Sequence, residues 1–433
     1  MRYIRPYLTL SALVVASPLA VAHADTITVC SDGSADHSTI QDAIDAADHG
    51  DVVLVCRGTY NEKIDFKGKA ITLRSTVGPK ITIIDATDLD DTVVTCVSGE
   101  GKDTVLDGFT ITGGNPIAPF PNNLGGGMFN EGSSPTVTRC IFLENTAGNG
   151  GGMYNLNSSP AVVDCKFVAN SATGVGVPGG FGGSGMVVNN SNPVVINCIF
   201  VKNDMTNNGG GMYIWGDSIA TVVNCTFFHN WVGDRGGGIM IAPNGGSPQA
   251  IITNSVFWAN GDHLSAESGQ IHVADGGTAA VSYSCIQGCA TFCADPVNHN
   301  IGGDPRFVDG DGPDDTPGTE DDDLHLSPGS PCIDAGTNDA VPVEFTADLD
   351  GYLRFVDGDD DGSKEVDMGA YEWAPDSDGD GIPNLYDVCP CTPAWVEHVD
   401  EHGCPIGDLD DDCDVDLNDF ATFAGSFGAV DCP

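Results

Sequence analysis

Oxygen ligands for a metal ion are concentrated near the C-terminal end of the sequence. In the first of two acidic loops the donors are Asp376, Asp378, Asp380, Asn384 and Asp387. The first three alternate along the chain, and Gly381 follows them where a calcium loop turns sharply. Alternating side chains converge their oxygens on a hard cation, so this spacing predicts a Ca²⁺ site. The alternative is a solvated acidic linker.

A second acidic loop follows the first. Its donors are Asp408, Asp410, Asp412, Asp414, Asp416 and Asp419. Cys413 stands where the turn glycine is expected, and Phe420 and Phe423 share one face of a short helix beyond the loop. This loop is also predicted to bind Ca²⁺, which is the one cofactor that the sequence indicates.

A few side chains could act as general bases. Lys202 and His229 each lie four residues after a repeated cysteine, so they should be neighbours in adjacent repeats. Glu144 holds the same place two repeats before Lys202, and Arg235 precedes a glycine turn. A base beside stabilising cations is what abstraction of the proton α to a uronate carboxylate requires. The alternative is that these are ordinary solvent-facing residues.

Aromatic residues recur at positions that should face outward. Phe129, Tyr154 and Tyr213 follow a repeated methionine, and Phe228 and Trp258 lie three residues after a repeated cysteine or serine. Exposed apolar columns mark ligand grooves or contacts, and aromatic rows suit the apolar faces of sugar rings. These five are the predicted ligand-binding residues. The alternative is that the capping segment or another subunit covers them.

One phrase, repeated five times, supplies the elements that position these residues. Its first half is Cys-x-Phe-x-x-Asn, beginning at residues 140, 165, 198, 225 and, with serine in place of cysteine, 255. Its second half is a glycine run followed by methionine or isoleucine. Short repeats with period-two apolar alternation predict an all-β solenoid, a right-handed single-stranded parallel β-helix.

Stacked repeats place like residues in columns. The phenylalanines should fill the interior, and the asparagine amides should bond along the coil, since a lone buried amide costs roughly 1–3 kcal/mol. The glycine runs should form a corner without room for a Cβ. The cysteines line up in a row instead of converging on a metal, so they are expected to be apolar packing. Residues 38–47 are expected to form an N-terminal helical cap.

Residues 1–24 combine a basic start, an apolar run and a small-residue cleavage site, which predicts a signal peptide and a secreted or cell-surface protein. No later run reaches membrane-spanning length. Sixteen cysteines in an exported chain permit disulfides. The expected pairs are Cys30–Cys56 and Cys389–Cys404, and the pairing stays open for Cys285, Cys289 and Cys293.

The formal charge of −46 is uneven along the chain. Residues 301–433 hold 36 of the 62 carboxylates but three basic residues. This concentration indicates cation-binding loops. The sequence has no basic stripe to neutralise phosphates, which excludes nucleic acid as a partner.

Several blocks resemble known families. Residues 58–62, which read Gly-Thr-Tyr-Asn-Glu, and residues 106–112 resemble the opening coils of pectin lyase-like right-handed β-helix proteins, including pectin methylesterases. The repeats also resemble those of polymorphic outer-membrane proteins and surface adhesins. Residues 291–375 are similar to the terminal module of secreted bacterial β-helix proteins, residues 376–405 to a thrombospondin type 3 repeat, and residues 406–433 to half of a dockerin.

The resemblance implies the fold more than an activity, because the full catalytic sets of pectin methylesterases and polygalacturonases are not found. We therefore expect a signal peptide (1–24), a β-helix (25–290), an acidic capping module (291–375) and two calcium regions (376–405 and 406–433). The expected function is non-catalytic binding of a polysaccharide or cell-surface polymer, with the calcium loops as spacer or as attachment to a protein partner. The alternatives are a polysaccharide lyase or glycoside hydrolase acting on uronate polymers, and a structural surface protein.

Overall fold

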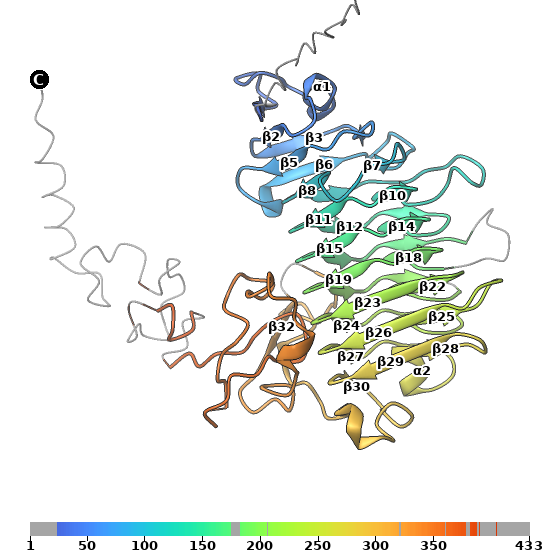
Figure 1. Ribbon diagram of the computed structural model, residues 1–433, viewed down its shortest axis with the longest axis vertical. Helices are drawn as coiled ribbons and strands as arrows, with labels where there is room; N and C mark the ends of the chain where they lie inside the picture. Colours follow the sequence, from blue (N-terminus) through green and yellow to red (C-terminus); the bar gives the residue numbers. More distant parts are fainter. Residues whose placement is uncertain are drawn as a thin grey trace, which may run out of the picture.

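The structure is a computed structural model in which parallel β-strands wind into a right-handed β-solenoid of about nine turns (Figure 1). It describes residues 24–174, 182–205, 207–319, 322–359, 361–377, 382–387, 389 and 404. The predicted solenoid is confirmed, because strands pair in parallel with the strands one turn before and after them. The predicted signal peptide, apart from its last residue, and the second calcium loop lie outside the described residues.

Three parallel sheets form the walls of the solenoid. In spatial order, sheet A comprises β1 (Thr26–Val29), β2 (Val52–Val55), β5 (Thr72–Ser75), β8 (Val105–Asp107), β11 (Thr136–Thr138), β15 (Ala161–Val163), β19 (Val194–Ile196), β23 (Ile219–Val223), β26 (Gln249–Thr253) and β29 (Thr278–Ser282). Sheet B comprises β3 (Gly58–Tyr60), β6 (Thr82–Asp85), β9 (Thr110–Thr112), β12 (Ile141–Leu143), β16 (Lys166–Val168), β20 (Ile199–Val201), β24 (Thr226–Phe228), β27 (Val256–Trp258) and β30 (Cys285–Ile286). Sheet C comprises β4 (Ile64–Asp65), β7 (Val94–Cys96), β10 (Met128–Glu131), β14 (Met153–Leu156), β18 (Met186–Asn189), β22 (Met212–Trp215), β25 (Ile239–Ala242) and β28 (Ile271–Val273). A small sheet follows sheet B and comprises β13 (Thr146–Ala147), β17 (Ser171–Ala172) and β21 (Asp204–Met205).

The interior carries the predicted columns. Stacked rings lie with their centroids between 4.5 and 4.7 Å apart, in the order Phe142, Phe167, Phe200, Phe227 and Phe257. Beside them runs a ladder of buried amides, formed by Asn145, Asn170, Asn203, Asn230 and Asn260. Each Nδ2 donates to the Oδ1 of the next asparagine over 2.8 to 3.1 Å, and the last one donates to Gln270. Both columns are therefore confirmed.

Glycine lines another corner because neighbouring backbones meet there. A Cβ on Gly127, Gly152 or Gly185 would lie between 2.4 and 2.6 Å from a carbonyl oxygen of the next turn. No side chain tolerates that distance, which explains the glycine runs. The cysteine column is fully buried in the core, as expected, and runs through Cys140, Cys165, Cys198 and Cys225.

Helix α1 (Ile40–Ala46) lies at the N-terminal end of the solenoid (Figure 1) and buries its apolar face in the core. The carboxylate of Glu62 accepts the backbone N–H groups of Ile40 and Gln41 at 2.8 and 2.9 Å. The Gly-Thr-Tyr-Asn-Glu block therefore fastens the start of this helix to the solenoid. Burial raises the pKa of Glu62.

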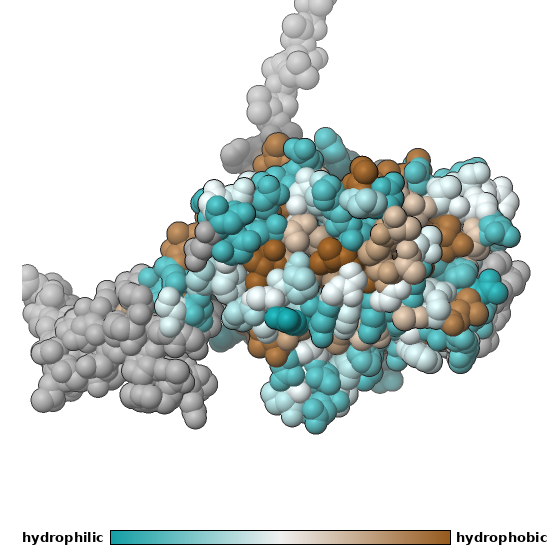
Figure 2. All heavy atoms as spheres, turned by 90° about the horizontal axis from the view of Figure 1, so that it is seen from below, coloured by the Kyte–Doolittle hydropathy of each residue, from teal (hydrophilic) through white to brown (hydrophobic). Residues whose placement is uncertain are grey.

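Short elements close the other end. They are α2 (Ala266–Gln270), η2 (Pro296–Asn298) and a loop joined by the Cys289–Cys293 disulfide. Viewed from below, hydrophobic residues form separate small groups among hydrophilic ones (Figure 2).

The expected Cys30–Cys56 and Cys389–Cys404 disulfides are present. A further short element, η1 (Pro79–Ile81), precedes β6. No helix in the described part of the chain is long and apolar enough to cross a membrane.

The described residues between 305 and 373, here called the covering segment, pack along the side of the solenoid on sheet B (Figure 1). We expected this module to cap the end of the solenoid, and the structure corrects that expectation. The fully buried guanidinium of Arg354 donates to Asn197 Oδ1 over 2.9 Å, and Asn254 Nδ2 donates to the Thr337 carbonyl over 3.0 Å. Within the described residues, the regular elements of the covering segment are β31 (Phe307–Asp309), β32 (Asp323–Leu326) and η3 (Asn338–Ala340).

A polar contact joins the covering segment to β16. Lys166 donates to the Tyr371 hydroxyl over 2.9 Å, and the His325 ring stacks on the Tyr371 ring at 3.9 Å. Asp323 and Asp350 hold the two ring nitrogens of His325 at 2.6 and 2.9 Å. Burial lowers the pKa of His325, but hydrogen bonds and charges from both carboxylates outweigh it and raise the pKa to about 9. Burial lowers the pKa of Lys166.

The asparagine ladder predicts that Asn203→Ala destabilises the protein strongly. The change leaves buried polar groups of Asn170 without their acceptor, and we expect the free energy of unfolding to fall by roughly 3 kcal/mol. Chemical denaturation measures this difference. The control is Asn244→Ala, at an exposed asparagine, where we expect a change within about 0.5 kcal/mol. Equal losses for the two variants would contradict the role of the ladder.

The His325 contact predicts a pH-dependent stabilisation. Its folded pKa lies above the ordinary value of about 6.5, so the stabilisation is complete below about pH 6.5 and is lost as pH rises through about 9. We expect His325→Gln to lower the thermal midpoint at pH 6 and to match wild type near pH 10. The His325 side chain is 37% exposed, so solvent screens the ion pairs and the shift is small. An equal difference at every pH would mean that the ring acts by packing alone.

Candidate functional site

Two columns of residues follow sheet B, and we call them the shoulder. The first column has backbone φ angles between 51° and 55° and comprises Glu144, Ala169, Lys202, His229 and Ala259. The second column is paired along the small sheet and its bridges, and comprises Thr146, Ser171, Asp204, Trp231 and Gly261. Each turn bends at the same place, because the asparagine ladder lies between the two columns and must stay in line.

Four polar or aromatic residues lie together at the centre of the shoulder. They are Lys202, Asp204, His229 and Trp231. Asp204 Oδ1 accepts the backbone N–H of Trp231 over 3.1 Å, which joins two successive turns. Burial raises the pKa of Asp204, and this hydrogen bond and the charges of Lys202 and His229 oppose the rise. Lys202 also lies against Gly318, so the covering segment borders the shoulder on the sheet B side.

Trp231 presents an aromatic ring on the shoulder, and the residue is 51% exposed. A Cβ on Gly261 would meet its ring atoms at 2.1 Å, so the indole lies directly on the glycine backbone. His263 meets the ring edge-on, with the ring centroids 6.2 Å apart. The glycine therefore supports the ring from below while the rest of it faces solvent.

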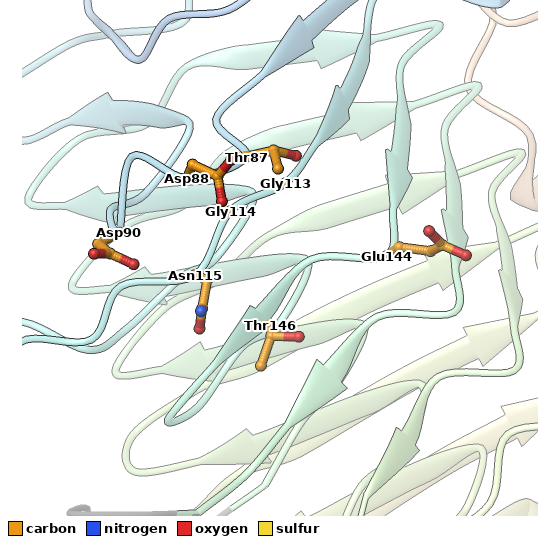
Figure 3. Close-up of a pocket in the computed structure, with 8 residues that line it drawn as sticks. All are labelled: Thr87, Asp88, Asp90, Gly113, Gly114, Asn115, Glu144 and Thr146. Atoms are coloured by element: carbon orange, nitrogen blue, oxygen red, sulfur yellow. The ribbon is translucent and has the colours of Figure 1, made fainter.

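The upper end of the shoulder borders a polar recess of about 290 Å³ (Figure 3). Glu144 and Thr146, the first residues of the two columns, form part of its wall. Asp88 and Asp90 contribute from the loop after β6, and Figure 3 shows them on the side away from Glu144. The remaining lining residues are Thr87, Gly113, Gly114 and Asn115. The recess is thus acidic and continuous with the shoulder.

The structure brings some of the predicted basic residues together and separates one. Lys202 and His229 occupy one column with Glu144, as the spacing predicted. Arg235 lies elsewhere, because it pairs with Asp234 at 3.6 Å and its charge acts on His272 of sheet C. Asp204 and Trp231 were not among the residues predicted from the sequence. The available signal was their position, two residues after Lys202 and His229 and directly after the asparagine of the ladder.

The outward-facing aromatic residues predicted on sheet B, Phe228 and Trp258, are covered by the covering segment. Phe228 is 7% exposed, and its ring meets Phe307 edge-on with centroids 5.4 Å apart. Gly310 packs on the same ring, and Trp258 is partly buried in the same contact. The covering segment, which was the alternative, explains the stripe. The prediction of an open ligand groove at Phe228 and Trp258 is wrong because a non-repeating segment fills that space.

The aromatic residues of sheet C are also enclosed. Tyr154 and Tyr213 point away from the main core, yet they are 3% and 2% exposed and lie in small clusters of their own. Burial raises the pKa of both hydroxyls to about 12. Phe129 is partly buried against Tyr154. The prediction that these rings form an exposed platform is therefore corrected.

One group of carboxylates in the described part of the chain could hold a cation. Ligand oxygens of Asp334, Asp357 and Asp359 lie within 4.8 Å of one another. One buried oxygen of Asp334 and one of Asp357 have no hydrogen-bond partner. Burial raises the pKa of Asp334, and the neighbouring carboxylates add to the rise. A divalent cation would match this concentration of negative charge.

The first predicted calcium loop is described only in part. Asn384 Oδ1 accepts the backbone N–H of Ser377, and its Nδ2 donates to the Ser377 hydroxyl. The Asp387 carboxylate accepts the backbone N–H of Cys389. Asp376 also lies in the described residues, whereas Asp378 and Asp380 lie outside them.

A family model described as the right handed beta helix region matches residues 94–227, the central turns of the solenoid. No curated protein matches the sequence significantly. Similar solved structures include the pectate lyase Pel9A, at 13% identity over 82% of this chain and 97% of that chain, with a TM-score of 0.42. A pectin methylesterase from carrot has 14% identity over 59% and 82% of the two chains, with a TM-score of 0.32. A deglycosylated pectin methylesterase from Aspergillus niger has 14% identity over 63% and 92%, with a TM-score of 0.29.

Proposed function

We propose that this protein binds a glycan or similar surface polymer along the shoulder without catalysing its breakdown. The observation that carries the proposal is Trp231, an exposed ring supported on Gly261 and flanked by charged side chains. An aromatic face packs on the apolar face of a sugar ring, and polar groups around it bind the hydroxyls. Asp204, Lys202 and His229 supply those polar groups.

The shape of the shoulder suits an extended polymer. Its columns contain five turns, and strands of successive turns lie about 4.8 Å apart, so the shoulder runs for about 19 Å. The recess beside Glu144 lies at one end, and Trp231 lies near the other. A chain of several sugar units lying parallel to the solenoid axis would contact both.

The charge of the protein favours a neutral polymer over a polyuronate. The chain has 62 acidic and 16 basic residues, so its field repels a polyanion at long range. Within the shoulder, the one formal positive charge, on Lys202, is outnumbered by the carboxylates of Asp204 and Glu144. Binding of a uronate polymer would need bridging cations.

A polysaccharide lyase acting on uronate polymers is the second candidate function. The neighbouring positions of Lys202 and His229 favour it, because either could accept a proton from a bound sugar. A structural surface protein is the third, and it would neither bind nor cleave a polymer. Secretion through residues 1–24 and attachment through the C-terminal region belong to the same proposal.

We also propose that Ca²⁺ binds the C-terminal loops at residues 376–387 and 408–419. Their alternating oxygen donors support this assignment. Bound cations would offset part of the negative charge of residues 301–433 and would stiffen a spacer between the solenoid and a protein partner.

The shoulder predicts that Trp231→Ala weakens polymer binding by about tenfold or more, which corresponds to a loss of at least ~1.4 kcal/mol. Affinity electrophoresis against neutral and uronate polysaccharides measures the change. The matched control is Ile219→Ala, an exposed apolar residue on sheet A, which should bind like wild type.

Two results would overturn the proposed function. Absence of retention on every polysaccharide would leave the structural role. Release of unsaturated uronate products, detected by their ultraviolet absorbance and lost in Lys202→Ala, would establish the lyase instead.

The calcium proposal predicts that chelation lowers the thermal midpoint of the full chain and that added Ca²⁺ restores it. Titration calorimetry should show fewer bound ions in Asp387→Ala, whereas the exposed control Asp103→Asn should match wild type. Asp334→Asn tests whether the three-carboxylate group contributes a further ion. A midpoint that is indifferent to Ca²⁺, together with no measurable heat of binding, would exclude the proposal.

A further inference from the structure

Two free thiols meet where the covering segment joins the end of sheet B. Cys285 belongs to β30 of the solenoid, and Cys332 belongs to the covering segment. Both residues are completely buried in one small cluster, in which the Cys285 thiol donates to the Gly303 carbonyl over 3.0 Å. The two thiols therefore share one buried cluster although 46 residues lie between them in the chain.

The backbone on each side of this contact is held in place. The Cys285 N–H donates to the Ser255 carbonyl over 2.9 Å, in line with the parallel pairing of β30 with β27. The Cys332 N–H donates to the Ser330 hydroxyl over 3.1 Å, and the Cys332 carbonyl accepts the Met368 N–H over 3.0 Å. The surrounding side chains are apolar and include Val256, Leu326 and Met368.

We propose that Cys285 and Cys332 are the two halves of a disulfide that fastens the covering segment to the solenoid. The reaction consumes a disulfide oxidant of the exchange type, such as oxidised glutathione. One S–S bond forms between Cys285 and Cys332, the S–S bond of the oxidant breaks, and the two thiol hydrogens leave on the two reduced oxidant molecules. An exported chain that already contains the Cys30–Cys56 and Cys289–Cys293 bonds meets such oxidants.

The bond must form while the chain folds. Both thiols are completely buried in the folded protein, so a disulfide oxidant cannot reach them once the covering segment is docked. Oxidation therefore precedes complete docking and then holds Gly318 against Lys202 at the edge of the shoulder.

A peptide map of the exported full chain, or of chain refolded with reduced and oxidised glutathione, tests the proposal. The protein is unfolded in guanidinium without reductant, alkylated and digested, and its peptides are identified by mass spectrometry. We expect Cys285 and Cys332 in one linked pair that reductant separates. Alkylation of both cysteines, or linkage of either to Cys391, Cys413 or Cys432, would overturn the proposal.

Limited proteolysis gives a second measurement. Cleavage between residues 294 and 331, beyond the Cys289–Cys293 disulfide, should leave the two fragments joined on a non-reducing gel, and reductant should separate them. In Cys332→Ser the fragments should separate without reductant. Cys225→Ser, which removes a buried thiol of the core column, is the control and should keep the fragments joined. Separation of the wild-type fragments without reductant would also reject the bond.

Discussion

The whole structure depends on successive turns lying in register, so that one residue type meets itself along the solenoid. Buried amides show the strength of this constraint. The Asn203 oxygen accepts a hydrogen bond from Asn170 in the turn before, and its nitrogen donates one to Asn230 in the turn after. If one turn were displaced by one residue, several buried polar groups would lose their hydrogen bonds, and each would destabilise the fold by about 1–3 kcal/mol. Variation in repeat length must therefore be absorbed outside the strands, and the glycine corner keeps the backbones close enough for this register.

The same constraint organises the surface. A column inside the solenoid implies a column outside, so the left-handed bend that carries Lys202 recurs at His229 and Ala259 although none of them is glycine. The backbone geometry of this surface is therefore the same in each turn, and only the side chain at each position differs from one turn to the next. The shoulder combines the acidic recess at one end with Trp231 near the other without any change in the fold.

Repetition explains what could be predicted from the sequence. The phenylalanine stack, the amide ladder and the Cys30–Cys56 pair follow from residues that recur at one position or lie on adjacent turns. The covering segment does not repeat, and its contacts join distant residues, such as Arg354 and Asn197, 157 positions apart. No periodicity encodes such a contact. The sequence therefore offered the burial of Phe228 as one of two alternatives and could not decide between them. Trp231 was missed because its exposure depends on Gly261 in the next turn.

The covering segment also has too few cations for its carboxylates, and this shortage shapes its packing. Backbone N–H groups take the place of cations: Asp348 accepts three of them, and Asp367 accepts those of Asp334 and Trp373. This solution is incomplete, because burial raises the pKa of Asp367 to about 7. Each further carboxylate must then be protonated, exposed or paired with a metal ion. A chain under this constraint would gain more from binding cations than from binding an anionic polymer, which is the physical reason that the proposed function combines calcium with a neutral glycan.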